Sequence, residues 1–253
     1  MRIVRYQVNN APPRYGWLSE GLIGEIKGDI FGEYRREEAT IPLDDAHLLA
    51  PACPSKIVCV GRNYAAHARE HNAEVPKVPI LFMKPPSAII NPGDPILLPP
   101  QSQQVEHEGE LVVVIGKRAR HLTPEGAKDY ILGYTIGNDV TARDLQRLDN
   151  QWTRAKGFDT FCPFGPWIDT DFDPSDAVIT CRVNGQLRQM ASTRDMIFNV
   201  GSLLAFISSI MTLEPGDLIF TGTPAGVGPL HEGDVVEVEI EGLGKLSNPV
   251  KAA

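Results

Sequence analysis

Short apolar runs rich in β-branched residues recur along this chain, and each is bounded by Gly, Pro, Asn or Asp. Apolar runs bounded by turn-forming residues in this way are typical of short strands joined by turns. From residue 56 onward the runs are KIVCVG, ILFMKP, ELVVVIG, YILGYTIGND, AVITCRV and DLIFTG. They lie too close together for regular βαβ units, and the 23 glycines and 21 prolines in 253 residues exceed average usage. The sequence therefore predicts a β-rich protein of the α+β class.

Turn signals indicate where the strands reverse. The pair Asn184-Gly185 predicts a hairpin, because both residues tolerate the positive φ of a type I′ turn. Lys27-Gly28-Asp29 can reverse the chain between two strands of the first fifty residues. In EGDVVEVEIEG, apolar residues alternate with Glu, which predicts a strand with one face in water.

Helices are expected at two places. Thr123 followed by Pro124 predicts a helix that begins there, since Thr is a favoured N-cap and Pro is favoured in the first turn. Asn199 predicts a second N-cap, before apolar residues at helical spacing that end by Pro215.

A compositional break divides the chain. The segment 48–55, LLAPACPS, holds two prolines between apolar stretches. We therefore expect a small N-terminal β-rich domain at residues 1–52 and a larger domain at residues 53–253.

The charge balance narrows the possible partners and compartment. The 24 Lys and Arg residues against 32 Asp and Glu give a formal net charge of -8, which opposes binding to nucleic-acid phosphates. The N-terminus lacks the apolar core of a signal peptide, and no apolar segment reaches the roughly 20 residues of a membrane span. The four cysteines form no C-x-x-C pair and suit a reducing compartment. We expect a cytoplasmic protein with no nucleic-acid or membrane partner.

Three glutamates precede the apolar run LVVVI. Strand alternation would place Glu106, Glu108 and Glu110 on one side of the chain. Their charges would repel one another, and a hard cation with oxygen ligands would relieve that repulsion. The lack of a His or Cys partner at zinc spacing in this run favours Mg²⁺, Mn²⁺ or Ca²⁺ over zinc. The alternative is a solvated strand end.

A metal site here needs a further oxygen ligand, and TIGNDVTARDLQ offers one. Asp139 lies where an apolar strand ends, and a loop carboxylate at that position could reach a metal ion. The segment by itself favours a different interpretation, in which Asp139 or Thr141 caps the following helix.

The segment GRNYAAHAREH holds a candidate proton-transfer pair. In a helix, Glu70 and His71 would share one face with His67, and a His–Glu pair can activate water. The segment also matches the H-x-x-E-H pattern of inverted zinc peptidases. A polar surface helix with solvated histidines fits equally well.

The glycine-rich segment DLIFTGTPAGVGPL follows a strand but does not satisfy the requirements of a phosphate-binding loop. It has no G-K-[ST], and a proline and a further strand follow rather than a helix. Its backbone amides could still bind a carboxylate.

Six segments in order, GRNYAAHARE, ILFMKP, VEHEGELVVVIGKRAR, LGYTIGNDVTARDLQ, WTRAKGFDTFCPFGPW, and VNGQLRQ with PGDLIFTGTPAGVG, carry a family resemblance. Together they resemble the fumarylacetoacetate hydrolase family over roughly residues 55 to 250. The resemblance implies a mixed β-sandwich roll with a small N-terminal sheet domain, assembled as a homodimer. It also implies a Mg²⁺ or Mn²⁺ site that holds a 2-oxo acid.

The resemblance assigns roles to particular residues. It implies that Glu108, Glu110 and Asp139 bind the metal, while Glu106 receives no role. The other implied site residues are His67 and Glu70 as a pair in a lid, Lys156 beside the metal, and Arg143, Gln146 and Thr223 around the substrate. The lid, residues 62 to 76, has only Tyr64 and Val75 as large apolar residues, so we expect it to pack weakly when empty.

The expected chemistry follows from these roles. The metal would stabilise an enolate of the 2-oxo acid, and His67 would take a proton from attacking water. We expect hydrolysis of a carbon-carbon bond in an acylpyruvate such as fumarylpyruvate or a fumarylacetoacetate-like compound. The alternatives are an isomerase or decarboxylase of a diacid such as 2-hydroxyhepta-2,4-diene-1,7-dioate or oxaloacetate and, more distantly, a zinc peptidase or a non-catalytic binding module.

Overall fold

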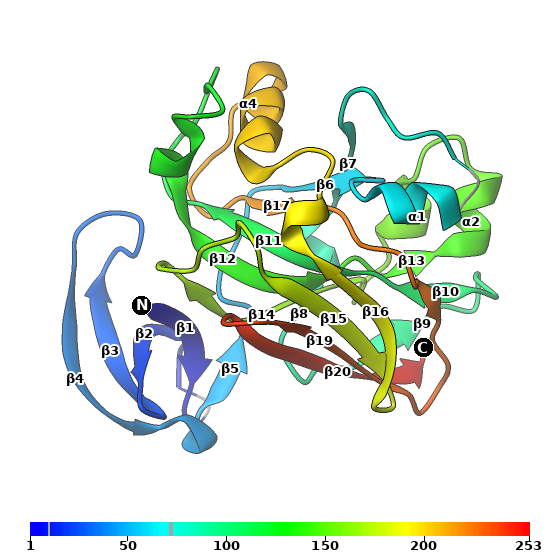
Figure 1. The fold of residues 1–253 in the computed structure, drawn as a ribbon. Helices are drawn as coiled ribbons and strands as arrows, with labels where there is room; N and C mark the ends of the chain where they lie inside the picture. The colour runs from blue at the N-terminus through cyan, green and yellow to red at the C-terminus, as the bar shows by residue number, and fades with distance from the viewer. Residues whose placement is uncertain (10, 71–72) are drawn as a thin grey trace.

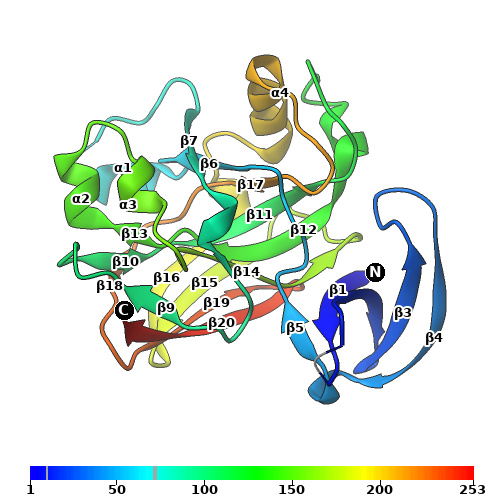
Figure 2. The same cartoon turned by 180° about the vertical axis from the view of Figure 1, so that it is seen from behind.

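Strands dominate the computed structural model, which describes residues 1–9, 11–70 and 73–253. Three sheets form the body of the molecule, and short helices lie around them (Figures 1 and 2). The five-stranded sheet packs against strands β11, β12 and β14 of the largest sheet, so the body is a β-sandwich. The predicted β-rich α+β fold with mixed sheets is confirmed.

The largest sheet runs in the order β4-β3-β2-β1-β14-β12-β11-β17-β6-β7, with β5 paired to β1 and β8 paired to β14. Its strands are β1 Arg2–Gln7, β2 Arg14–Ser19, β3 Leu22–Gly28, β4 Tyr34–Pro42, β5 His47–Leu49, β6 Ile57–Gly61, β7 Ile80–Lys84, β8 Ile89–Ile90, β11 Gly109–Ile115, β12 Ile131–Asn138, β14 Cys162–Asp169 and β17 Leu218–Phe220. The N-terminal strands, blue in Figure 1, join the sheet where β1 pairs antiparallel with β14.

Two smaller sheets complete the body. The five-stranded sheet has the order β16-β15-β19-β20-β9, with β16 Gln186–Ser192, β15 Val178–Val183, β19 Val235–Ile240, β20 Gly244–Ala252 and β9 Ile96–Leu98. The three-stranded sheet has the order β13-β10-β18, with β13 Thr141–Ala142, β10 Val105–His107 and β18 Gly228–Pro229.

Strand β11 is buried along its whole length and on both faces. Val113 packs in the core that includes Val238 of β19, whereas Val112 packs in a second core with Phe164 and Phe220. Two-sided burial explains why this strand is a continuous apolar run rather than an alternating one. The strand therefore carries its first residues, Gly109 and Glu110, into the interior.

The predicted turns and the alternating strand are confirmed. Asn184 and Gly185 have φ of 51° and 76° and join the antiparallel strands β15 and β16. Gly28 lies at the end of β3, opposite Tyr34 of β4, so the chain reverses there. In β19 the alternating apolar residues Val236, Val238 and Ile240 are buried, whereas Val235 at the start of the strand is exposed.

The helices are few and short. They are α1 Ala65–Glu70, α2 Arg143–Leu148, α3 Thr153–Lys156 and α4 Val200–Ile210, with 3-10 turns η1 Leu43–Asp45, η2 Pro86–Ala88, η3 Ala127–Tyr130 and η4 Thr193–Asp195. The Asn199 cap is confirmed, because its side chain accepts a hydrogen bond from the Ser202 amide. The helix predicted at Thr123 is wrong. Thr123 accepts a hydrogen bond from the Gly126 amide in a turn, and strand β12 starts at Ile131, which leaves room only for η3.

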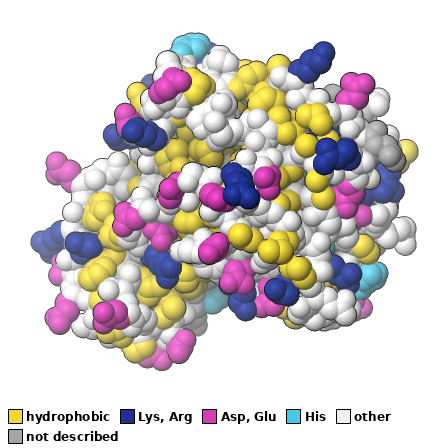
Figure 3. Space-filling model, in the orientation of Figure 1, with side chains coloured by type: hydrophobic (Ala, Val, Ile, Leu, Met, Phe, Trp, Pro, Cys, Tyr) yellow, Lys and Arg dark blue, Asp and Glu magenta, His cyan; other side chains and the backbone are white. Residues whose placement is uncertain are grey.

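Two features of the helices and the surface concern possible membrane and nucleic-acid partners. In the described part of the chain, no helix combines the length and apolar character needed to cross a bilayer. On the face shown in Figure 3, acidic and basic side chains are interspersed and do not gather into a patch of one sign.

Candidate active site

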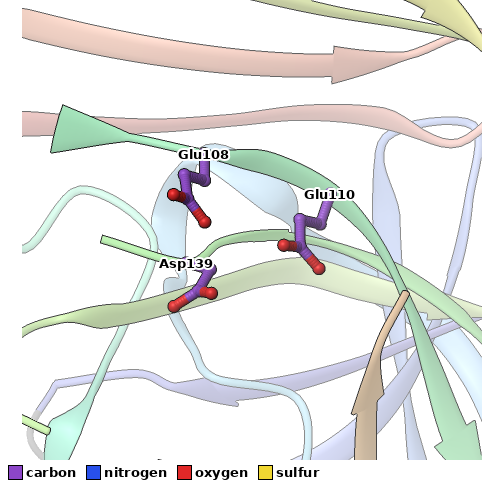
Figure 4. A group of neighbouring side chains, drawn as sticks. All are labelled: Glu108, Glu110 and Asp139. Atoms are coloured by element: carbon purple, nitrogen blue, oxygen red, sulfur yellow. The ribbon is translucent and has the colours of Figure 1, made fainter. Parts of the chain in front are cut away.

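The pairing of β11 with β12 brings three carboxylates together. Glu108 immediately precedes β11, Glu110 is its second residue, and Asp139 immediately follows β12. In the antiparallel register Gly109 lies opposite Asn138, and the Asp139 amide donates a hydrogen bond to the Glu108 carbonyl at 2.9 Å. One oxygen from each carboxylate lies within 4.8 Å of the others, and all three residues are buried (Figure 4).

Two buried lysines face this cluster. Lys156 Nζ lies 2.8 Å from Glu108 Oε2 and 2.6 Å from Asp139 Oδ2. Lys84 Nζ lies 2.7 Å from Asp139 Oδ1. Sequence reasoning missed Lys84, although one signal was present: it is the only charged residue in the apolar run ILFMKP.

Glu110 differs from its two neighbours in its partners. Its Oε2 accepts a hydrogen bond of 2.7 Å from the Gly222 amide, but it forms no ion pair with any described residue. Burial and the charges of Asp139 and Glu108 raise the pKa of Glu110 well above its usual range. Burial would also raise the pKa of Glu108, but Lys156 and Arg143 hold it well below its usual range.

The cluster suits a divalent cation. Its oxygen donors are the ligand type that Mg²⁺ and Mn²⁺ prefer. Four buried carboxylates in this region, the three above and Glu106, face three buried cationic side chains, Lys84, Lys156 and Arg143. A cation at the three carboxylates would relieve the repulsion that acts on Glu110.

Glu106 lies apart from the three-carboxylate cluster. Strand β10 ends at His107 and belongs to a different sheet from β11, so Glu106 does not share one regular strand with Glu110. Its Oε2 lies 2.7 Å from Arg143 Nε, and its Oε1 accepts a hydrogen bond from Gln104 Nε2. Glu106, which the sequence left without a role, is therefore a buried counter-ion of Arg143.

Removing the Glu106 carboxylate should destabilise the folded protein. We expect Glu106→Ala to lower the free energy of unfolding by about 3 kcal/mol, because Arg143 stays buried with one partner fewer. The matched control is Glu214→Ala, which removes the exposed ion pair with Arg118 and should cost less than about 1 kcal/mol. Urea denaturation measures both. An equal loss of unfolding free energy in the two variants would show that burial does not make the Glu106–Arg143 pair more important for stability than an exposed ion pair.

His67 lies in α1 and is only 5% exposed, so the alternative of solvated histidines is wrong for this residue. Its Nδ1 lies 3.2 Å from Glu70 Oε2, and Glu70 also accepts a hydrogen bond from the Gly226 amide at 3.0 Å. Burial lowers the pKa of His67. His71, the last residue of the H-x-x-E-H match, lies outside the described residues.

The start of the expected lid is firmly held. Asn63 and Tyr64 are buried, and Asn63 Nδ2 donates to the carbonyls of Phe198 and Thr221 at 3.0 and 2.8 Å. The expected weak packing is thus wrong for Asn63 and Tyr64, because a buried amide with two backbone partners and a buried ring anchor this part of the segment. Gly222 has φ of +98°, and a Cβ there would lie 2.6 Å from the Asn63 Cβ, so a larger residue would displace this anchor.

The cluster and α1 line one pocket of about 300 Å³. The lining residues are Val60, Gly61, Arg62, His67, Phe82, Glu108, Glu110, Asp139, Arg143, Gln146, Arg147, Trp152, Lys156 and Thr223. The interpretation of Asp139 as a helix cap is wrong, since α2 begins at Arg143 with Ala142 at its N-cap position. The strand pairing turns the Asp139 carboxylate to the pocket instead.

Two family models match the chain. The model of the fumarylacetoacetate (FAA) hydrolase C-terminal domain matches residues 56–251. The chain belongs to the fumarylacetoacetate hydrolase family. A second model, described as Rv2993c-like, N-terminal, matches residues 1–51, so the two matches meet near the boundary predicted at residue 52.

Several proteins similar to this family member have names or solved structures. Oxaloacetate tautomerase FAHD2B, mitochondrial, from Bos taurus is 48% identical over 83% of this chain and 71% of its own. The crystal structure of 2-hydroxyhepta-2,4-diene-1,7-dioate isomerase from Mycobacterium marinum is 47% identical, with a TM-score of 0.92 and coverage of 100% and 98% of the two chains. The structure of maleylpyruvate hydrolase from Sphingobium sp. SYK-6, in complex with manganese (II) ion and pyruvate, is 32% identical, with a TM-score of 0.83 over 100% of both chains.

The structure gathers the residues that the family resemblance implied. Eight of the nine line the pocket: His67, Glu108, Glu110, Asp139, Arg143, Gln146, Lys156 and Thr223. The remaining one, Glu70, lies behind His67 and contacts its Nδ1. In this fumarylacetoacetate hydrolase family member, sequence reasoning missed Lys84 and the aromatic pair Phe82 and Trp152, and it left Glu106 without a role.

Proposed function

We propose that this protein is a divalent-metal-dependent enzyme that hydrolyses a carbon-carbon bond of an acylpyruvate-type 2-oxo acid. The observation that carries the proposal is one small pocket lined by three buried carboxylates, a buried lysine and a histidine that contacts a glutamate. Mg²⁺ or Mn²⁺, when bound, supplies positive charge that stabilises an enolate. The similar maleylpyruvate hydrolase, whose structure contains manganese (II) and pyruvate, supports this choice of cofactor and substrate class.

The pocket residues would have separate roles in binding the metal ion and the substrate. Glu108, Glu110 and Asp139 would hold the ion. Lys156 and Arg143 bring positive charge to the pocket and suit the anionic oxygens of a 2-oxo acid. Lys156 Nζ also lies 4.8 Å from the centre of the Phe82 ring, a contact that limits its movement.

His67 is the proposed proton acceptor. Glu70 is a hydrogen-bond acceptor, so it favours the tautomer of His67 with a proton on Nδ1 and leaves Nε2 as the basic nitrogen. A neutral imidazole in a pocket can take a proton from an attacking water and later return it.

Tautomerisation or isomerisation of a 2-oxo diacid is the second candidate. Similarity favours it, because the oxaloacetate tautomerase and the diene-dioate isomerase are 48% and 47% identical to this chain. These reactions need proton transfers but no attacking water. Decarboxylation of oxaloacetate would use the same pocket without either attack or isomerisation.

Steady-state assays separate the candidates. The protein is stripped of metal, restored with Mn²⁺ or Mg²⁺, and offered fumarylpyruvate, 2-hydroxyhepta-2,4-diene-1,7-dioate and oxaloacetate. Hydrolysis should release pyruvate from fumarylpyruvate only in the metal-restored protein. Metal-independent turnover, or no turnover of any 2-oxo acid, would contradict the proposal.

The pH dependence of kcat/KM should reveal His67. A base acts in its neutral form, and burial lowers the pKa of His67 from its ordinary value of about 6.5. Activity should therefore rise with pH through a pKa below that value and reach a plateau near neutral pH. Glu70 raises the pKa of His67, so Glu70→Gln should move this rise to still lower pH. A rise centred above about pH 7 would contradict the assignment.

We also propose that the protein is a homodimer, an inference that rests on the family. Light scattering at micromolar concentration should give twice the 27.7 kDa mass of the chain. The monomer mass under the same conditions would contradict this.

A further inference from the structure

A fully hydrogen-bonded glutamine lies directly behind the pocket. Gln189 of β16 is 1% exposed and is not among the pocket-lining residues. Its Nε2 donates to Thr223 Oγ1 at 2.7 Å and to the Pro224 carbonyl at 2.8 Å. Its Oε1 accepts from the Gly109 amide at 3.0 Å and lies 3.1 Å from His107 Nδ1. All four hydrogen-bonding positions of this side chain are therefore in use.

Two backbone groups determine the orientation of the Gln189 side-chain amide, that is, the positions of its oxygen and its nitrogen. If the amide turned by 180°, Nε2 would face the Gly109 N–H and Oε1 would face the Pro224 carbonyl oxygen. Both contacts would be repulsive, since neither pair contains a donor and an acceptor. The end of Gln189 that faces Thr223 is consequently always the donor.

The polarity of Gln189 sets the polarity of the Thr223 hydroxyl. A hydroxyl has one proton to donate and two positions that accept. Thr223 Oγ1 accepts from Gln189, and its single proton goes to the Gly109 carbonyl at 2.9 Å, because a carbonyl only accepts. One accepting position is left, and Thr223 lines the pocket.

We propose that Gln189 is a positioning residue that makes the Thr223 hydroxyl a hydrogen-bond acceptor toward the pocket. The bound group next to Thr223 Oγ1 is then an O–H donor and not a carboxylate oxygen. The assignment deepens the proposed function and rests on it: the two O–H donors in that chemistry are the attacking water and the enol hydroxyl of the 2-oxo acid.

Neutron diffraction tests the hydroxyl directly. Crystals of the perdeuterated, Mn²⁺-loaded protein should show the deuterium of Thr223 Oγ1 directed at the Gly109 carbonyl and both deuterium atoms of Gln189 Nε2 directed at Thr223 and Pro224. A deuterium of Thr223 directed into the pocket would overturn the inference. This result does not depend on which substrate the enzyme uses, so it tests the inference independently of the proposed function.

A double-mutant cycle tests the consequence for turnover. Thr223→Val and Gln189→Met should each lower kcat about tenfold with KM changed less than about twofold, the size expected for one hydrogen bond. If Gln189 acts through Thr223, the double variant should lie within about twofold of Thr223→Val. Multiplied losses would show that Gln189 acts by another route and would overturn the assignment. If these variants lose only fumarylpyruvate hydrolysis, the group that donates to Thr223 Oγ1 is the attacking water. If they lose oxaloacetate tautomerisation as well, that group is the enol hydroxyl.

Two further variants serve as controls. Gln186→Met makes the same change at an exposed position of β16 and should leave both reactions unchanged. Gln189→Glu keeps an acceptor toward Gly109 but places a second oxygen toward Thr223, so it should lower kcat even if Gln189→Met fails to fold. Wild-type activity in Gln189→Glu would count against the proposal. Absence of turnover in the wild type would reject the proposed function and leave the neutron result to decide this inference.

Discussion

Replacing Glu110 by glutamine is expected to weaken Mn²⁺ binding at least tenfold and to remove measurable turnover, while the protein stays folded. The reason is its partners: Glu110 is buried, contacts the Gly222 amide, and forms no ion pair within the described residues. A glutamine oxygen can still accept from Gly222. The change therefore removes one anionic ligand and little else.

The other two carboxylates should behave differently. Asp139→Asn and Glu108→Gln should also weaken Mn²⁺ binding at least tenfold, but each leaves buried cations with fewer partners. Asp139 pairs with Lys84 and Lys156, so its loss should lower the free energy of unfolding by about 3–5 kcal/mol. Glu110→Gln should cost far less, because it leaves no cation unpaired.

Calorimetry with Mn²⁺ and urea denaturation measure the two effects separately. Asp129→Asn, an exposed change of the same kind, is the control and should alter neither quantity. Unchanged Mn²⁺ affinity in all three cluster variants would rule out the site. His71→Ala should keep the metal, whereas loss of metal in that variant would support the zinc-peptidase alternative.

Replacing His67 by alanine is expected to lower kcat for hydrolysis by about 10²- to 10⁴-fold, the usual contribution of a general base, and to leave Mn²⁺ affinity unchanged. His67 lines the pocket beside the carboxylates but is outside the three-residue cluster. Glu70→Gln should lower kcat less, because Glu70 acts by orienting His67. Its glutamine can still accept a hydrogen bond from the Gly226 amide, so α1 should keep its place.

Steady-state kinetics of the same variants give the decisive comparison. Decarboxylation of oxaloacetate needs no attacking water and should suffer less from His67→Ala than hydrolysis does. Glu74→Gln, an exposed change in the same segment, should have no effect. Metal loss in His67→Ala, or equal losses in hydrolysis and decarboxylation, would reject the role assigned to His67.

The strands and most of the site could be predicted from local sequence. Period-two alternation in β19, continuous apolar character in β11 and the Asn184-Gly185 turn each depend on neighbouring residues alone, so the pattern is visible in one dimension. The three candidate metal ligands could be named from the sequence because the family motifs place them at fixed positions beside these strands, and the structure brings their carboxylates together. Glu108 and Glu110 are also a candidate metal site on physical grounds, since a bound cation would relieve the repulsion between like charges so close in sequence.

Long-range partners could not be predicted in this way. Lys84 is 55 residues from Asp139 in sequence, and nothing in either segment indicates that sheet pairing places them 2.7 Å apart. The anchor at the start of the expected lid was also a long-range contact. The small number of apolar residues predicted weak packing, but the Asn63 side-chain amide donates to carbonyls more than 130 residues away in sequence.

The sequence by itself thus determined which residues form strands and which carry the candidate chemistry, because both depend on side-chain type and near neighbours. Only the tertiary structure decided the charge partners, and with them the distinct environments of Glu106, Glu108 and Glu110. Three glutamates that look alike in the sequence become a counter-ion of Arg143, a carboxylate with a lowered pKa and one with a raised pKa. Burial and the distance to each cation set these differences, and both arise only when the sheets pack together.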